Sequence, residues 1–582
     1  MPASTTLYDL CRDRAETRPD STAFTFLHGG EAAADLTYRG LDDAARGIAA
    51  GLAPLARPGD RALLLYEPGL DFLAAFYGCL YAGLIPAPVP PPNARKATQA
   101  LARLMAIAAS AEATLLLSTG GLLARLAAAL GTDGATGPAA LGITPVATDL
   151  LTADPADWRP PRPTPDDPAY LQFSSGSTGQ PKGTVITHSA ALHNLDQISR
   201  TCGLGPEHGL VSWLPMHHDT GLVAGALVPL HDGFPVWLMS PLEFLQRPAA
   251  WLSAISRLPV TGTVAPDFGY ELCVRRVNER QRADLDLSGL RLALSGAEPV
   301  RPATIEAFTQ AFEPCGFRST AFLPCYGLAE ATLLVSGGPA ETGVRTLGCD
   351  AEALAHNDVV PAAGAPGART LVACGQVVHG VEAVIVDPES TTPCPPGRVG
   401  EIWLDGPNVG SGYYNDPERT AETFGAVLAG TPGRTYLRTG DLGFLHEGLL
   451  YITGRIKDVL IVDGRNLYSQ DLELTIRESH PALDAHKCAV FPVDDGTREE
   501  IVAVVEADPD DGPDEDRLAK TVREAVGAEH GVQLDRVLAV RPGSIPLTAS
   551  GKVQRFACRD AVLDGTLDAA RITPPAPAPE EV

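Results

Sequence analysis

One polar loop constrains this chain more than any other segment does. It lies between two apolar, strand-like runs, Ala169 to Phe173 and Thr184 to Thr187. Glycines let backbone N–H groups approach an anion closely, hydroxyl groups add donors, and a lysine adds a mobile positive charge. The loop residues that could act in this way are Ser174, Ser175, Gly176, Ser177, Thr178, Gly179 and Lys182. The loop therefore predicts a polyphosphate site, with a flexible surface loop as the alternative.

The segment after the loop narrows the fold. Lys182 is followed by Gly-Thr-Val-Ile-Thr, which is rich in β-branched residues and predicts a strand. A Walker-type phosphate loop leads instead from a strand into a helix. We therefore expect a phosphate loop of another kind, which joins one strand to the next.

Strands and helices alternate along much of the chain, which predicts an α/β fold of helix-covered, mostly parallel sheets. The clearest unit is a strand, a helix and a second strand at Arg61–Tyr66, Asp71–Ala82 and Ile85–Val89. With 582 residues the chain is too long for one core, so we expect at least two domains. Residues 130–168 are rich in Gly, Ala, Pro, Thr and Asp and predict a long surface connection.

Changes in composition divide the chain further. Short strands and turns at about 375–447 predict a small β-rich subdomain, and the segment at about 345–370, with few large apolar side chains, predicts an inserted loop. A compact pattern after Thr453 predicts a small α+β domain. We therefore expect an N-terminal domain at residues 1–456, a junction at 457–458 and a C-terminal domain at 459–566. The Pro-rich and acidic residues 567–582 are expected to form a disordered tail.

The charge balance argues against some partners. The formal net charge is −26, whereas binding to nucleic acid or to anionic membranes needs an excess of Lys and Arg, so we expect neither nucleic acid nor stable membrane association. The eleven cysteines form no Cys-x-x-Cys pair, which favours free thiols in a reducing compartment. The first residues do not resemble a signal peptide and no apolar run reaches transmembrane length, so we expect a cytoplasmic protein.

Further short motifs carry groups that could bind a nucleotide. Each is weak alone, because Gly/Asp turns and solvated lysines are common, but their order along the chain is informative. One of them brings an aromatic ring, a glycine and a carboxylate close together in sequence. The motifs are Ser295–Pro299, Pro324–Thr332, Tyr436–Gly443, Gly454–Asp458 and Ser550–Lys552.

Together with the phosphate loop, these motifs resemble those of the adenylate-forming superfamily, from about Leu7 to Leu563. Three segments are similar to the fatty acyl-AMP ligases in particular: Leu171-Gln-Phe-Ser-Ser-Gly-Ser-Thr-Gly, Ser212-Trp-Leu-Pro-Met-His-His-Asp-Thr-Gly-Leu and Pro324-Cys-Tyr-Gly-Leu-Ala-Glu-Ala-Thr-Leu. The segment at about 345–370 lies where those ligases carry a family-specific insertion. His217 and Thr220 depart from the commonest ligase form, which leaves the shape of the pocket open.

The resemblance implies a reaction and an acceptor. A fatty acid would be activated with ATP to an acyl-adenylate, with release of pyrophosphate. The acyl group would then pass to the phosphopantetheine thiol of an acyl carrier protein, and the implied cofactors are ATP and Mg²⁺. Two alternatives stay open: an acyl-CoA synthetase with coenzyme A as acceptor, and a nucleotide-binding regulator that has lost catalysis.

The resemblance also implies roles for single residues. The loop that ends at Lys182 would hold the β- and γ-phosphates, and Glu330 with Thr178 would bind Mg²⁺. Lys552 would reach the α-phosphate and the carboxylate oxygens, and His218 would orient the carboxylate. The alternatives are an ordinary surface lysine and a polar turn. The residues implied around the adenine and ribose are Gly296, Ala297, Tyr326, Gly327, Asp441 and Arg455.

The remaining assignments concern motion, docking and the acyl chain. By resemblance, Lys457 and Asp458 would form the hinge of the C-terminal domain, with an ordinary loop ion pair as the alternative. Candidates for docking an acidic carrier protein are Arg477, Lys487 and Arg498. The residues expected to line an acyl pocket, or else to belong to the core, are His217, Leu222, Leu238 and Met239.

Overall fold

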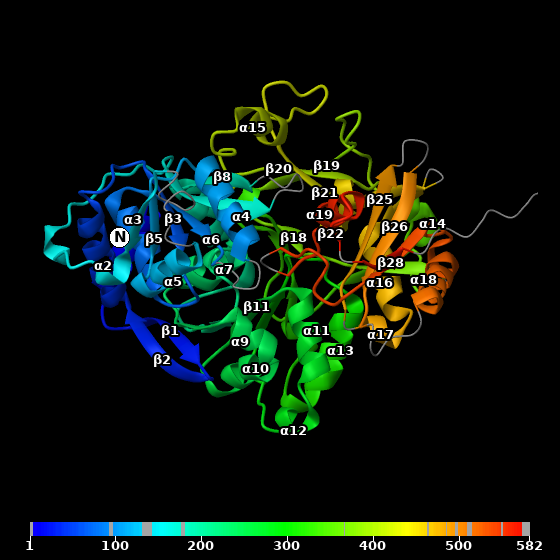
Figure 1. Cartoon of the computed structure of the whole chain (residues 1–582), viewed down its shortest axis with the longest axis horizontal. Coiled ribbons are helices and arrows are strands. Elements are labelled where there is room, and N and C mark those ends of the chain that lie inside the picture. Colours follow the sequence, from blue (N-terminus) through cyan, green and yellow to red (C-terminus); the bar gives the residue numbers. More distant parts are fainter. Residues whose placement is uncertain are drawn as a thin grey trace, which may run out of the picture.

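The computed structural model of the chain is the structure on which the following description rests. It describes residues 4–91, 97–130, 142–175, 181–365, 367–462, 465–484, 486–494, 499–508, 515–548, 551–567 and 569–572. Within these residues the chain forms helix-covered sheets in a large N-terminal part and a smaller sheet with its own helices in the C-terminal part (Figure 1).

The first N-terminal sheet is wholly parallel and confirms the predicted strand–helix–strand unit. Its strands lie in the order β4-β3-β5-β6, namely Ile85–Val89, Arg61–Leu65, Leu115–Ser118 and Thr144–Ala147. The neighbouring helices along the chain are α2 to α5, namely Tyr38–Leu52, Asp71–Ala82, Ala97–Ser110 and Gly120–Leu130. Strand β6 lies within the segment that we predicted to be only a surface connection. It is short and contains Pro145, which an edge strand accepts because one side of it needs no hydrogen bonds.

The second N-terminal sheet has the order β13-β12-β11-β9-β10-β1-β2. Its strands, in the same order, are Phe322–Pro324, Leu292–Ser295, Gly262–Ala265, Leu210–Ser212, Val236–Met239, Thr22–His28 and Glu31–Thr37. Only the hairpin of β1 and β2 is antiparallel. The carboxyl ends of β9, β12 and β13 therefore lie at one edge of the sheet, where α/β folds bind their ligands.

The predicted phosphate loop joins β7 (Pro168–Ser175) to β8 (Pro181–Thr187). These two strands form an antiparallel pair in which Ser174 lies opposite Lys182. This confirms a connection from strand to strand. Gly176, Ser177, Thr178 and Gly179 lie outside the described residues.

The residues that we predicted to form a β-rich subdomain contain most of an antiparallel sheet in the order β19-β20-β21-β22. Its strands are Glu382–Val386, Gly400–Asp405, Leu437–His446 and Leu449–Arg455.

The segment predicted as an inserted loop at about 345–370 is instead structured. It forms the strands β16 (Thr346–Asp350) and β17 (Ala368–Val372), which pair antiparallel, and the helix α14 (Ala351–Ala355). Leu354 within the segment and Leu371 directly after it are buried in one cluster with Phe444 and Tyr468 from distant parts of the chain. Because this order depends on distant partners, local composition did not reveal it.

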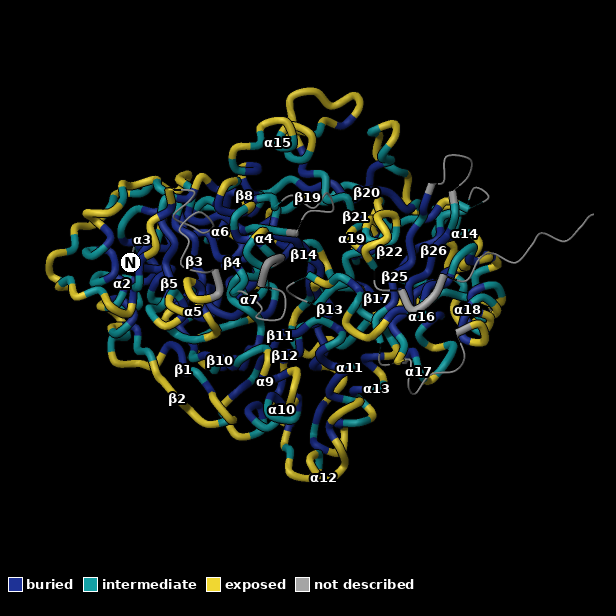
Figure 2. Tube along the Cα trace, in the orientation of Figure 1, coloured by how far each residue is buried: buried dark blue, intermediate teal, exposed yellow. Residues whose placement is uncertain are grey.

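The C-terminal part carries the sheet β25-β26-β27-β28 with its own buried core. The tube of β26 is largely dark blue in Figure 2, which marks buried residues. The strands are Cys488–Asp494, Glu499–Glu506, Arg536–Val540 and Ala569–Ile572, and the main helices α16, α18 and α19 are Ser469–Glu478, Glu515–His530 and Arg555–Leu563. Strand β28 lies inside the segment that we expected to be a disordered tail, and it pairs antiparallel with β27. Among the described helices, none is both long and apolar enough to cross a bilayer.

Candidate functional site

A cleft of about 3740 Å³ lies where the two N-terminal sheets, the β subdomain and the C-terminal domain meet. Its walls include Lys182, His218, Glu330, Asp441 and Lys552, which are far apart in the sequence. The fold therefore brings together the side chains that the sequence motifs single out.

The phosphate-loop lysine lies on β8 against an aromatic ring. Lys182 Nζ lies 5.1 Å from the centroid of the Tyr413 ring, a cation–π arrangement. Burial lowers the pKa of Lys182, and the nearby carboxylate of Glu330 opposes this shift. Because burial disfavours the charged form of Lys182, an anion close to Nζ would stabilise that form.

Glu330 is held by the same tyrosine. The hydroxyl of Tyr413 donates a hydrogen bond of 2.9 Å to Oε1 of Glu330. Burial, followed by the charge of Glu330, raises the pKa of Tyr413, so the hydroxyl stays protonated and remains a donor. Tyr413 belongs to no motif that the sequence singled out, and it joins Lys182 and Glu330 into one unit.

The predicted ribose site is a chain of three side chains. Tyr326 donates a 2.7 Å hydrogen bond to Oδ2 of Asp441, and Arg455 Nε donates a 2.6 Å bond to Oδ1 of the same carboxylate. Asp441 and Arg455 are paired across the neighbouring strands β21 and β22, which explains their contact. The charge of Asp441 raises the pKa of Arg455, and burial and then Asp441 raise the pKa of Tyr326.

Gly296 and Gly327 are required by backbone packing. A Cβ at Gly296 would meet the Sγ atom of Cys325 at 2.7 Å, and one at Gly327 would meet the carbonyl oxygen of Leu333 at 1.8 Å. The position that a Cβ of Gly296 would take is thus filled by Cys325, the residue before Tyr326, while Gly296 itself lines the cleft. Ala297 has a φ of +66°, in the left-handed region, and turns the chain at the end of β12.

Lys552 lies on a tight loop of the C-terminal domain. Its carbonyl oxygen accepts a 2.7 Å hydrogen bond from the N–H of Thr548, and its own N–H donates a 3.0 Å bond to the hydroxyl of Thr548. Burial lowers the pKa of Lys552, and the carboxylates of Asp219 and Glu298 in the N-terminal domain oppose the shift. The lysine therefore faces negative groups across the boundary between the domains.

His218 forms an ion pair with its neighbour. Its Nδ1 atom lies 2.5 Å from Oδ1 of Asp219. Burial raises the pKa of Asp219, but the positive charge and hydrogen bond of His218, together with Lys552, outweigh it and lower that pKa to about 2. His217 differs, because burial lowers its pKa to about 3 and its Nε2 atom has no hydrogen-bond partner among the described residues. No group of three or more metal-binding side chains exists within the described residues.

The helix that follows this pair is distorted at the cleft. Residues Val223–Leu227 form one π-helical turn between α7 (Asp219–Leu222) and α8 (Val228–Asp232), and Ala224 in this turn lines the cleft. Pro229 offers no N–H to continue the α-helical ladder, which accounts for the widened turn. Such turns often occur at functional sites.

The acyl-pocket expectation is only partly met by the geometry. His217 lines the cleft, whereas Leu222, Leu238 and Met239 are buried in the core and are not among the described residues that line it. The apolar cleft residues missed by sequence reasoning include Leu242 and Leu245 on α9 (Pro241–Gln246), which are exposed.

The expected hinge is a single 3₁₀ turn, η9 (Ile456–Asp458), between β22 and β23 (Val459–Val462). Oδ2 of Asp458 lies 2.7 Å from NH1 of Arg555, and Arg555 also forms a two-pronged ion pair with Glu473 on α16. The junction is thus anchored to the helix that begins three positions after Lys552.

Two of the expected docking residues face the N-terminal domain. NH1 of Arg477 lies 3.9 Å from Oε1 of Glu271, and Nζ of Lys487 lies 5.9 Å from the Phe268 ring centroid. Neither forms a free basic surface in this arrangement, so they do not support the docking role that we expected. Arg498 lies outside the described residues.

Comparison with known sequences identifies the family. The AMP-binding enzyme family matches residues 11–414, and the AMP domain of Disco-interacting protein 2-like proteins matches residues 457–571. The medium-chain-fatty-acid–acyl-carrier-protein ligase JamA of Moorena producens is 42% identical over 573 residues, which cover 97% of this chain and 96% of that protein. The long-chain-fatty-acid–AMP ligase FadD26 of Mycobacterium marinum is 36% identical, with 94% of this chain and 96% of that protein covered.

Solved structures agree with this result. The fatty acyl-adenylate ligase of L. pneumophila in complex with acyl adenylate and pyrophosphate is 37% identical, covers 98% of both chains and superposes with a TM-score of 0.76. A structure from work on fatty acyl-adenylate ligases of E. coli and L. pneumophila has a TM-score of 0.88 at 33% identity, with 97% of this chain and 99% of that chain covered. The chain therefore belongs to the fatty acyl-AMP ligases, a family of ATP-dependent AMP-binding enzymes.

Proposed function

We propose that this ligase couples a fatty acid to AMP in the cleft and then passes the acyl group to the phosphopantetheine thiol of an acyl carrier protein. The observation that carries the proposal is the meeting of Lys182, Glu330, Asp441 and Lys552 in one cleft. In the first half-reaction, a carboxylate oxygen attacks the α-phosphorus of ATP, a new P–O bond forms and pyrophosphate leaves. Because both reactants are anions, the site has to supply positive charge and oriented donors.

The described residues fit these roles. Lys182 and the backbone of its loop would bind the β- and γ-phosphates, and Lys552 would stabilise charge on the α-phosphate and the carboxylate. Asp441 would accept hydrogen bonds from the ribose, with Tyr326 and Arg455 fixing its two oxygens. Lysines that burial has already partly desolvated lose little water when an anion arrives, which makes them effective partners for phosphate.

A magnesium ion fits the site at Glu330. Glu330 lines the cleft, and one of its carboxylate oxygens accepts the Tyr413 hydrogen bond. Mg²⁺ in phosphate-transfer sites needs only one or two carboxylates besides phosphate oxygens. Glu330 would hold the ion, with Thr178 as the second protein ligand that the family resemblance implies. The ion would neutralise charge on the phosphates of ATP.

Two observations favour a carrier protein over coenzyme A as acceptor. One relative, JamA, bears the name of an acyl-carrier-protein ligase. In addition, two ion pairs join the inserted segment to the C-terminal domain. NH2 of Arg369 lies 3.0 Å from Oδ2 of Asp471 on α16, and Oε2 of Glu352 lies 4.0 Å from NH1 of Arg465. These ion pairs would restrain the domain rotation about Lys457 and Asp458 that thioester formation requires. Breaking them would need compensating contacts from the acceptor, which a protein surface supplies better than a free cofactor does.

The acyl chain would leave the adenylate site along the apolar wall. The candidate path is lined by Trp213, Met216, Leu242 and Leu245, which belong to the same cleft as His218.

All eleven cysteines are free thiols, which supports the cytoplasm as the compartment of the enzyme.

The test has two stages. Pyrophosphate release is first measured with ATP, Mg²⁺ and saturated fatty acids of several lengths; release with none of them would reject the adenylating activity. The acyl-adenylate is then offered to a phosphopantetheinylated carrier protein, to the same protein without phosphopantetheine, and to coenzyme A. The proposal requires thioester formation with the first acceptor only, and equal transfer to coenzyme A would identify an acyl-CoA synthetase.

A further inference from the structure

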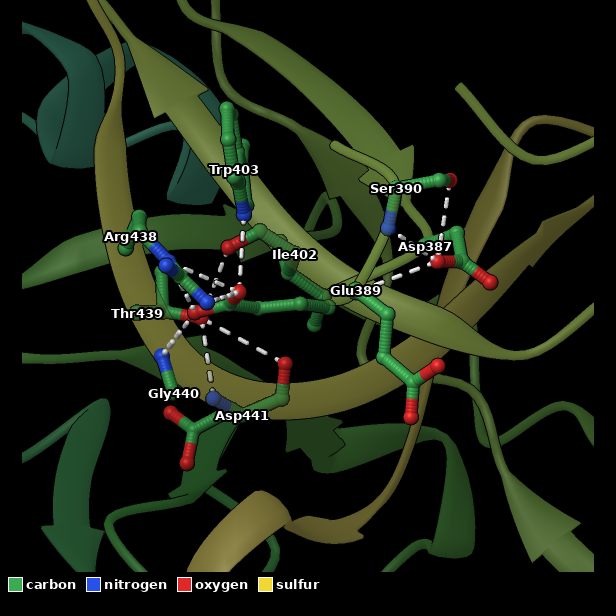
Figure 3. A network of polar contacts seen from close by, with 10 residues as sticks. Asp387, Glu389, Ser390, Ile402, Trp403, Arg438, Thr439, Gly440 and Asp441 are labelled. Atoms are coloured by element: carbon green, nitrogen blue, oxygen red, sulfur yellow. Dashed lines mark hydrogen bonds and ion pairs between the residues drawn. The ribbon is translucent and has the colours of Figure 1, made fainter. Parts of the chain in front are cut away.

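A buried glutamate lies behind the ribose site. Glu401 on β20 is 1% exposed, and its two carboxylate oxygens accept hydrogen bonds from three groups. The donors belong to Trp403, Arg438 and Gly440, which Figure 3 labels. Oε2 accepts from Arg438 NH2 at 2.7 Å and from the Trp403 indole N–H at 2.9 Å. Oε1 accepts from the backbone N–H of Gly440 at 3.1 Å.

Glu401 binds the backbone N–H of Gly440, and Gly440 directly precedes Asp441. The pairing of β20 with β21 is irregular at this point. Glu401 lies opposite Leu442, and the next paired position sets Trp403 opposite Arg438. Residues 439–441 of β21 therefore bulge out of the ladder opposite the single residue Ile402. Bulges next to active sites redirect a side chain, and here the redirected side chain is Asp441.

The Glu401 carboxylate occupies the inside of this bulge. Gly440 has a φ of +70°, in the left-handed region, so its N–H turns toward Glu401. The hydroxyl of Thr439 donates a 2.8 Å bond to the carbonyl oxygen of Ile402 and accepts a 3.1 Å bond from the N–H of Asp441. The bulge is thus attached to β20 at Arg438, Thr439 and Gly440.

The surroundings balance the buried charge. The guanidinium of Arg438 lies 5.4 Å from the Trp403 ring centroid, so the same indole that donates to Glu401 also packs against its counter-ion. Glu401, Arg438, Gly440 and Asp441 all line the cleft. A carboxylate with this number of donors keeps one orientation, because rotation would leave buried donors unpaired.

We propose that Glu401 is a positioning residue that sets the direction of the Asp441 carboxylate through the bulge and thereby makes the enzyme selective for the ribose of ATP. In this role Glu401 would act through the backbone of Gly440 and not by contact with the nucleotide. The inference depends on the proposed role of Asp441 as acceptor of the ribose hydroxyls. A residue with a purely structural role would change stability without changing the choice between nucleotides.

The test compares ATP with 2′-deoxy-ATP in the pyrophosphate-release reaction of the full chain. Glu401→Gln keeps the shape of the side chain but presents an amide NH₂ to donors. We expect KM for ATP to rise about tenfold while kcat changes less than about threefold, and the preference for ATP over 2′-deoxy-ATP to fall about tenfold. The matched control is Asp405→Asn, on the same strand, whose carboxylate lies 2.6 Å from Arg434 at an exposed position.

Three further arms make the result decisive. Asp441→Asn defines the selectivity that remains when the ribose acceptor itself is changed. Trp403→Phe removes the indole donor together with part of the buried ring, and it serves as the second variant if Glu401→Gln does not fold. It should lower the preference by about threefold. The preference is the ratio of kcat/KM for ATP to kcat/KM for 2′-deoxy-ATP. If this ratio is unchanged in folded Glu401→Gln or folded Trp403→Phe, the proposal is overturned. A wild-type enzyme that releases no pyrophosphate with any fatty acid would instead reject the proposed function.

Discussion

The hydroxyl of Tyr326 donates a 2.7 Å hydrogen bond to Oδ2 of Asp441, and both side chains are buried at the cleft wall. The substitution Tyr326→Phe keeps the ring and removes this bond. We expect KM for ATP to rise about ten- to a hundredfold, because one hydrogen bond to a charged group contributes about 1.5 to 3 kcal/mol. Steady-state pyrophosphate release measures the effect. Tyr77→Phe is the control, since the buried hydroxyl of Tyr77 has no partner among the described residues.

Glu330 should control the magnesium requirement. Glu330→Gln removes the charge but keeps the shape and an oxygen that can accept from Tyr413. We expect the Mg²⁺ concentration for half-maximal activity to rise at least about tenfold, with a lower kcat. A magnesium titration at saturating ATP measures this. Glu422→Gln, at an exposed position of the cleft, should leave the titration unchanged; an equal effect of both variants would remove the metal-binding role from Glu330.

Lys552 should act in adenylate formation. Lys552→Ala should fold normally and lose about two to four orders of magnitude in rate, because a charge that stabilises the transition state in a dry site contributes roughly 3–5 kcal/mol. ATP–pyrophosphate exchange provides the measurement. Lys520→Ala, on the exposed face of the same domain, is the matched control. Near-normal exchange by Lys552→Ala would show that the lysine is an ordinary surface residue.

The hinge at Lys457 should separate the two half-reactions. Lys457 lies in the first turn of η9, so a proline at this position would fix the backbone of the junction. We expect Lys457→Pro to form the adenylate near the wild-type rate but to transfer the acyl group at least about tenfold more slowly, because the dihedral angle φ is fixed. Pyrophosphate release and carrier-protein acylation are followed in parallel. Equal loss of both activities would contradict a hinge.

A buried histidine should make stability depend on pH. The ring of His188 accepts a 3.2 Å hydrogen bond from the N–H of Leu7, and burial lowers the pKa of His188 to about 4. This pKa lies below the value of about 6.5 in the unfolded chain. The neutral ring of His188 therefore contributes fully to the free energy of unfolding above pH 6.5, and this contribution is lost as the pH falls toward 4. The loss should reach up to about 3 kcal/mol at the low end.

Urea unfolding between pH 7 and pH 4 tests this effect. In His188→Asn the amide oxygen can still accept the Leu7 N–H, so the variant should lose less stability than the wild type as the pH falls. His28→Asn changes an exposed histidine and serves as the control. Parallel pH profiles for the wild type and His188→Asn would contradict the prediction.

Local elements were largely predictable from sequence. The helix Asp71–Ala82 and the strand Ile85–Val89 have the predicted bounds, because apolar periodicity and turn residues act over a few positions. The structure of the segment at about 345–370 was not predictable from sequence, since Leu354 and Leu371 pack against Tyr468 and Phe444 from distant parts of the chain.

Some residues of the candidate site were likewise predictable from sequence, and others were not. Lys182, Glu330, Asp441 and Lys552 belong to short motifs and were found by their residue types, order and spacing. Tyr413 and Glu401 were missed, because each acts through a partner that is distant in sequence: Tyr413 through Glu330, and Glu401 through Gly440. No local spacing marks a tyrosine that anchors a carboxylate or a glutamate that fills a bulge.

The amino-acid sequence by itself determined the family, the reaction class and the identity of the groups that carry charge in the cleft, because these depend on residue types in a fixed order. The tertiary structure alone decided which way those groups face. The direction of Asp441 depends on a bulge between two strands, and the approach of Lys552 to Asp219 depends on two domains packing together. Both are contacts across long stretches of chain, and their geometry exists only after the core has formed.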